Sequence, residues 1–199
     1  MSSYKTLKTD SRSYFKEKGS KFYGYAFPIK TKDEVKSKIE EIQAEHPKAR
    51  HICTALLIGV GDDAYFLTND DGEPANSAGA PILGQIRSHE ITNVFIAVVR
   101  YFGGTKLGIG GLIAAYKQTT SEAITANEII EVEPEKTVYI SVDYTLLGDL
   151  LSIIDKNNLS VTLENKNTSA VISLTFEERN ETEVLALFQR YDLEIREAK

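Results

Sequence analysis

Residues 98–112 read Val-Val-Arg-Tyr-Phe-Gly-Gly-Thr-Lys-Leu-Gly-Ile-Gly-Gly-Leu. The apolar run Ile91–Tyr101 leads into this stretch and predicts a central strand covered on both faces. Leu112–Ile124 follows with helical apolar spacing and several alanines, which predicts a long helix. The five glycines between residues 103 and 111 therefore connect a buried strand to a helix. Because each glycine loses much backbone entropy on folding, their density indicates that another part of the protein, or a partner, approaches this backbone closely.

The glycine spacing does not match the usual phosphate-binding loops. No Gly-Lys-Ser/Thr completes a Walker A motif, and Ile113 stands where a dinucleotide fingerprint needs its third glycine. A helix N-terminus still offers free N–H groups to an anion, and Lys106 could add a charge there. The alternative is that Gly108, Gly110 and Gly111 let the helix pack tightly on the sheet.

Composition indicates a globular protein of ordinary type. The chain has 199 residues, of which 42% are hydrophobic and 26% are charged. Its one cysteine, Cys53, allows no internal disulfide and fits a reducing compartment. Residues 1–8 lack the apolar segment of a secretory signal, and the longest apolar runs are too short to cross a bilayer. We therefore expect a cytoplasmic protein with no membrane partner.

Charge is distributed unevenly along the chain. The formal net charge is −6, which argues against a generic nucleic-acid binder. Residues 5–38 nevertheless carry ten Lys/Arg against four Asp/Glu, whereas residues 134–199 carry seven against twelve. The N-terminal excess is either a solvated surface of lysines or a basic stripe for a phosphate backbone.

Residue patterns predict the other elements of the first two thirds of the chain. The expected order is a strand at Lys21–Ile29, a helix from the capping sequence Thr31–Glu34 to Pro47, strands at Ile52–Val60 and Ala64–Thr68, and a helix at Ser77–His89. Asp71-Gly72 is the strongest turn signal.

The polar segment Glu131–Lys136 is the best candidate linker, which predicts domains at 1–133 and 134–199. Beyond it the expected order is strand Thr137–Tyr144, helix Leu147–Lys156, strands Leu159–Asn165 and Ala170–Glu177, helix Glu181–Tyr191 and strand Leu193–Ile195. This βαββαβ order is ferredoxin-like and makes the chain an α+β protein.

Three carboxylates gather in Asp70-Asp71-Gly72-Glu73-Pro74. Carboxylate oxygens suit Mg²⁺, although the spacing is not that of an EF-hand loop. The favoured interpretation is an exposed turn in which Asp and Gly satisfy the backbone.

His51 and Cys53 lie two residues apart on a predicted strand, so they share a face. Such a pair could supply a base and a nucleophile, but most buried cysteines are inert. Zinc lacks a plausible ligand set. We therefore assign no catalytic residue, no metal and no cofactor.

Arg100-Tyr101-Phe102 combines a planar cation with two rings, which can stack on bases or grip phosphate. Equally, Arg100 could end a core strand and pair with Asp71 or Glu73. The pairing is our preferred structural hypothesis, because it would hold the two loops together.

Several motifs together resemble the YigZ/IMPACT family, closely from about residue 15 to 125. They are Lys21-Phe22, His46-Pro47-Lys48-Ala49-Arg50-His51, Asp70–Pro74, Ala78-Gly79-x-Pro81-Ile82-Leu83, Asn93-Val94 and Val98–Leu112, in which Arg-Tyr-Phe-Gly-Gly looks like the family signature. One departure is Asn76-Ser77, where the family more often has Gly or Ser followed by Thr.

The resemblance implies a ribosomal protein S5 domain 2-like domain followed by a smaller ferredoxin-like domain resembling elongation factor G domain V. Eukaryotic relatives regulate translation under amino-acid starvation by competing for the activator of an initiation-factor kinase that bacteria lack. For this chain the resemblance implies ribosome, RNA or translation-factor binding, and it does not supply an enzyme activity.

Three functions follow from these observations. The first is a non-enzymatic two-domain binding protein linked to translation, the second an enzyme that holds a phosphorylated ligand with Mg²⁺ at the glycine-rich helix start, and the third a protein–protein regulator. The candidate binding residues are Arg100, Tyr101, Phe102, Gly103, Gly104, Lys106, Gly108, Gly110 and Gly111, the acidic turn Asp70, Asp71 and Glu73, and in support His51 and Lys21.

Overall fold

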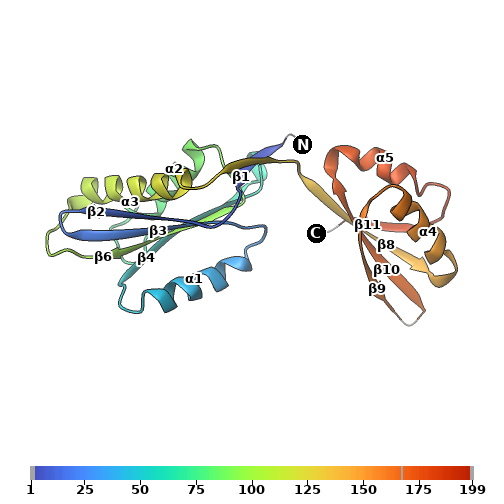
Figure 1. The fold of residues 1–199 in the computed structure, drawn as a ribbon, viewed down its shortest axis with the longest axis horizontal. Coiled ribbons are helices and arrows are strands. Elements are labelled where there is room, and N and C mark those ends of the chain that lie inside the picture. Colours follow the sequence, from blue (N-terminus) through green and yellow to red (C-terminus); the bar gives the residue numbers. More distant parts are fainter. Residues whose placement is uncertain (1–2, 167, 198–199) are drawn as a thin grey trace. The chain divides into compact units, whose positions relative to one another are not determined.

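The chain folds into two compact units, shown in a computed structural model that describes residues 3–166 and 168–197. The first unit spans Tyr4–Val132 and the second begins at Glu133 (Figure 1). Both combine helices with antiparallel sheets, so the α+β class is confirmed. None of the helices within the described residues is long and apolar enough to cross a membrane.

A five-stranded antiparallel sheet forms the middle of the first unit. Its spatial order is β2 (Ser11–Glu17), β3 (Ser20–Pro28), β6 (Val94–Tyr101), β4 (His51–Ile58) and β5 (Tyr65–Asn69). A separate ribbon pairs β1 (Tyr4–Leu7) with β7 (Ile129–Val132). A short 3₁₀ turn at Gly61–Asp63 connects β4 to β5.

Helices cover both faces of this sheet. α2 (Gly79–Ser88) and α3 (Gly108–Thr125) lie on one face, and α1 (Glu34–Glu45) lies on the other (Figure 1). Side chains of β6 alternate between the two cores: Val94, Ile96 and Val98 pack with α2 and α3, whereas Phe95, Ala97 and Val99 pack with Ile42 of α1. The predicted central strand covered on both faces is confirmed.

Strands β1, β2 and β7 were not predicted, and two expected boundaries in the first unit differ from the structure. α3 begins at Gly108 rather than Leu112, so three of the glycines form its first turn. Most of the polar segment at 131–136 belongs to strands, because β7 runs to Val132 and the next strand starts at Glu135. Only Glu133 and Pro134 of this segment lie outside strands.

The second unit has the predicted βαββαβ order. Its elements are β8 (Glu135–Asp143), α4 (Tyr144–Lys156), β9 (Ser160–Asn165), β10 (Ser169–Glu177), a 3₁₀ turn at Glu178–Asn180, α5 (Glu181–Ala186) and β11 (Glu194–Glu197). The sheet order β11-β8-β10-β9 places the first and third strands centrally, which is the ferredoxin-like arrangement. α5 ends five residues earlier than predicted, since turns follow it.

Candidate functional site

Several segments of the first unit meet at one end of its sheet. β3 and β4 are both antiparallel to β6, so the end of β6 lies between the beginnings of β3 and β4. The register places Arg100 between Phe22 and His51 on adjacent strands. The loop after β5 and the beginning of α3 lie at this same end of the sheet. Most of the candidate residues therefore lie there.

Arg100 forms a buried ion pair with Glu73. Its Nη1 donates to both carboxylate oxygens of Glu73, at 2.7 and 2.9 Å, and the Tyr116 hydroxyl on α3 donates to Oε1 at 2.9 Å. The two charged side chains are only 8% and 4% exposed. The expected pairing is thus confirmed for Glu73, and Arg100 is bound to the protein rather than free to grip a phosphate.

The acidic turn is held by the protein itself. Asp70 accepts the backbone N–H groups of Ala78 and Gly79 on Oδ1 and of Asn76 on Oδ2, at 2.7–3.0 Å, so it caps the beginning of α2. Asp71 has a φ of 42° and is followed by Gly72 at 82°, as the predicted tight turn requires.

The carboxylates of this turn are therefore occupied. Asp71 Oδ2 accepts the Ile52 N–H at 2.6 Å, and Glu73 is paired with Arg100. No group of three metal-ligating side chains occurs among the described residues. The geometry supports the structural turn over the magnesium interpretation, but Glu73 is buried rather than exposed.

Cys53 and His51 do not form the nucleophile–base pair that their spacing would allow. The Cys53 thiol donates to the Asp70 carbonyl at 3.0 Å and contacts the Tyr116 hydroxyl at 3.3 Å. His51 Nδ1 donates instead to the Asp71 carbonyl at 2.8 Å. Both residues anchor the acidic turn to β4.

We expect Cys53 to resist a disulfide thiol reagent at pH 8 while the protein is folded. Burial raises the pKa of the Cys53 thiol to about 12, and the nearby Glu73 carboxylate adds to the rise. The reactive thiolate is then a fraction of about 10⁻⁴ at this pH. Absorbance of the released thiol should show no reaction in buffer and one equivalent per chain in guanidinium chloride. Rapid stoichiometric labelling of the folded chain would contradict this assignment.

Tyr101 faces the opposite side of the sheet from Arg100. Its hydroxyl lies 3.0 Å from His46 Nδ1, and His46 Nε2 lies 2.5 Å from the Tyr25 hydroxyl. Burial lowers the pKa of His46, which favours the neutral ring. Tyr101 therefore ties the end of β6 to the end of α1, and sequence reasoning missed His46 as its partner.

The close backbone approach occurs at Gly103. A Cβ at this position would lie 1.8 Å from the Gly19 carbonyl carbon and 2.1 Å from the Ser20 nitrogen. The Gly103 N–H also donates to the Ser20 hydroxyl at 3.2 Å. The absence of a side chain at Gly103 thus allows the β2–β3 turn to pack against the end of β6.

The other glycines of the segment do not serve tight packing on the sheet. A Cβ at Gly104, Gly108 or Gly110 would meet nothing within 4 Å, and one at Gly111 would meet only the Leu107 side chain of the same helix end. Gly104 and Gly108 have positive φ angles of 88° and 71°. The packing interpretation is therefore wrong for Gly108, Gly110 and Gly111, and Gly110 in particular has no steric reason to be glycine.

A hollow of about 330 Å³ opens beside the ion pair. It is lined by Lys48, Arg50, His51, Arg100, Tyr101 and Phe102. Sequence reasoning missed Lys48 and Arg50 as site residues. Their position offered a signal, because both cations directly precede β4, the strand that pairs with the Arg-Tyr-Phe-Gly-Gly end of β6. Lys21 lies exposed on β3 opposite Tyr101, and Lys106 lies exposed just before α3.

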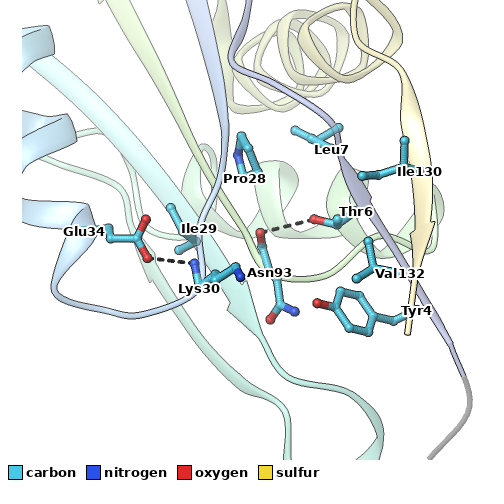
Figure 2. Close-up of a pocket in the computed structure, with 10 residues that line it drawn as sticks. All are labelled: Tyr4, Thr6, Leu7, Pro28, Ile29, Lys30, Glu34, Asn93, Ile130 and Val132. Carbon is cyan, nitrogen blue, oxygen red and sulfur yellow. Dashed lines mark hydrogen bonds between the residues drawn. The ribbon is translucent and has the colours of Figure 1, made fainter. Parts of the chain in front are cut away.

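A second hollow, of about 380 Å³, lies between the β1–β7 ribbon and the end of β3 (Figure 2). Its lining is mainly apolar, with Leu7, Ile130 and Val132 on the ribbon. The Glu34 carboxylate beside it accepts the Lys30 N–H at 2.8 Å. None of the candidate residues lines this hollow.

Comparison with known proteins identifies the family. The Impact N-terminal domain model matches residues 18–124. The chain is 35% identical over 148 residues to IMPACT family member YvyE of Bacillus subtilis, covering 74% of this chain and 68% of the relative. It is 44% identical to YigZ of Escherichia coli over 45% of this chain and 44% of the relative. A crystal structure of a hypothetical protein superposes with a TM-score of 0.81 at 26% identity, covering 100% of this chain and 98% of the other. The chain belongs to the IMPACT family.

Proposed function

We propose that this protein is a non-enzymatic, two-domain binding protein of translation that contacts RNA or the ribosome through one end of its first unit. The binding face consists of the β2–β3 turn, the segment before β4, and the segment between β6 and α3. The observation that carries the proposal is an accumulation of unpaired cations on this face.

Six exposed cations contribute to this face: Lys16, Lys18, Lys21, Lys48, Arg50 and Lys106. None of them forms an ion pair with a carboxylate in the part of the chain that the structure describes. The neighbouring Asp70, Asp71 and Glu73 accept hydrogen bonds from the protein itself. Glu73 is also neutralised by Arg100, so the six cations outnumber the remaining carboxylates of Glu17, Asp70 and Asp71. The face therefore presents positive charge despite the net charge of −6, and a phosphate backbone is its natural complement.

The family resemblance supports the connection with translation. The first unit provides the basic face, and the acidic second unit is of the ferredoxin-like type that the resemblance links to a translation factor. An enzyme with Mg²⁺ is less well supported, because its expected carboxylate ligands are occupied. Exposed Phe102 (58%) and Ile109 (59%) would also suit a protein partner, which the following experiment distinguishes.

We expect the purified protein to sediment with ribosomes or ribosomal RNA at about 50 mM salt and to be released at high salt, because counterion release drives such binding. A triple variant, Lys16→Gln, Lys18→Gln and Lys21→Gln, should lose most of the sedimenting fraction. A control that removes the same charge elsewhere, Lys32→Gln, Lys36→Gln and Lys117→Gln, should keep it. Absence of sedimentation at low salt would refute RNA binding, and a complex that survives nuclease would indicate a protein partner.

A further inference from the structure

The hollow between the beginning of β4 and the end of β6 has a lining that is unusual for a purely structural feature. Its walls combine charged side chains with aromatic ones, and none of the described residues that line it carries a carboxylate. Its volume of about 330 Å³ falls at the lower end of the range of about 300–1,000 Å³ that is usual for ligand sites. A site of this size admits one small planar group and its immediate attachments, but not a nucleic-acid duplex.

The charge at the hollow comes from its rim. Arg100 in the wall is neutralised by Glu73, whereas Lys48 and Arg50 are exposed and form no ion pair within residues 3–166 and 168–197. Both rim residues belong to the short segment that joins α1 to β4, so they approach the hollow from one side. Two neighbouring cations on flexible side chains are well suited to one phosphate group.

Phe102 provides an apolar flat surface. Its side chain is 58% exposed although it directly follows a buried strand, and its ring centroid lies 5.7 Å from the Arg100 guanidinium carbon. The other ring, Tyr101, is engaged with His46 and cannot turn outward without breaking that bond. Phe102 is therefore the ring available for stacking on a planar ligand.

Two polar groups in the wall have unused hydrogen-bonding capacity. His51 donates through Nδ1 to the Asp71 carbonyl, which leaves Nε2 as an acceptor in the neutral ring. Arg100 Nε–H is buried and has no acceptor among the described residues. A buried donor without an acceptor is unfavourable.

We propose that this hollow is the binding site for one unpaired nucleotide of a single-stranded RNA. The base stacks on Phe102, its edge faces His51, and the phosphate lies between Lys48 and Arg50. This inference rests on the proposed function and specifies its ligand. A duplex does not fit the site, since its bases are already stacked on one another and cannot reach the ring.

Fluorescence anisotropy with a labelled oligouridylate of about 12 nucleotides tests this assignment. Phe102→Ala should raise the Kd about 5- to 150-fold, as expected when the stacking of one base is removed. The double variant Lys48→Gln and Arg50→Gln should lower the slope of log Kd against log salt by about 0.7 for each phosphate that it no longer neutralises. Phe66→Ala on β5, an exposed phenylalanine (51%), and the double variant Lys36→Gln and Lys117→Gln, which removes two charges elsewhere, are the matched controls and should bind as the unchanged protein does.

Each result bears on one of the two proposals. If the unchanged protein binds neither ribosomes nor oligouridylate at low salt, the proposed function fails. If it binds them and Phe102→Ala and the double variant bind equally well, the hollow is not the site and only the proposed function survives. The assignment would also be overturned if uridine monophosphate bound as tightly as the oligonucleotide. It would equally be overturned if a duplex bound as tightly as the single strand.

Discussion

Replacing Arg100 by alanine is expected to lower the free energy of unfolding by about 3–5 kcal/mol. The substitution leaves the Glu73 carboxylate buried, 4% exposed, with the Tyr116 hydroxyl as its remaining side-chain donor. The attraction to Arg100 disappears while the cost of removing the Glu73 charge from water remains. Urea denaturation followed by circular dichroism measures the difference directly.

A second variant distinguishes the loss of the ion pair from general damage to the packing of β6. The double variant Arg100→Met and Glu73→Leu should be considerably more stable than Arg100→Ala, because it removes both charges and keeps much of the side-chain volume. Lys117→Ala on the surface of α3 is the control and should change stability by no more than about 0.5 kcal/mol. If Arg100→Ala unfolds at the same urea concentration as the unchanged protein, the pair does not stabilise the fold.

Gly103→Ala is expected to destabilise the first unit by about 1–3 kcal/mol or more. The added methyl would lie 1.8 Å from the Gly19 carbonyl carbon, and neither backbone can yield without moving the β2–β3 turn away from β6. Thermal unfolding should show a lowered Tm. Hydrogen exchange at the backbone N–H of position 103, which donates to the Ser20 hydroxyl, should be faster in the variant than in the unchanged protein.

Gly110→Ala is the matched comparison in the same segment. Its methyl meets nothing within 4 Å and lies in a helix, so this variant should be about 0.5–1 kcal/mol more stable than the unchanged protein. A stabilised variant that binds ribosomes less well would indicate that a partner approaches Gly110. Equal destabilisation by both substitutions would contradict the described surroundings of the two glycines.

Sequence predicted those parts of the fold that depend on local pattern. The long apolar run of β6 and the alternating βαββαβ order of the second unit are strong local signals. β1 and β7 were missed because each has four residues and its partner lies more than a hundred positions away. The beginning of α3 was missed because glycines disfavour helix, and here they form its first turn.

The contacts within the site could be predicted from the sequence only where two residues of opposite charge suggested an ion pair. Opposite charges on Arg100 and Glu73 suggested their pairing, which the structure contains. Nothing in the sequence indicated that Tyr116 contacts Glu73, because the residues around it predict only the buried face of a helix. The approach of Gly103 to Gly19 depends on how two distant turns meet, and no local pattern encodes that geometry.

The position of β6 has a consequence for how the chain acquires its structure during synthesis. The β2–β3 hairpin and the β4–β5 hairpin are complete by residue 69, but in the sheet only β6 joins them. Each hairpin therefore exposes an apolar edge and face to solvent until residues 94–101 have left the ribosome and inserted between them. Insertion of one late strand converts two separate hairpins into a single sheet, and it simultaneously brings the Arg-Tyr-Phe-Gly-Gly signature to the end where the cations gather.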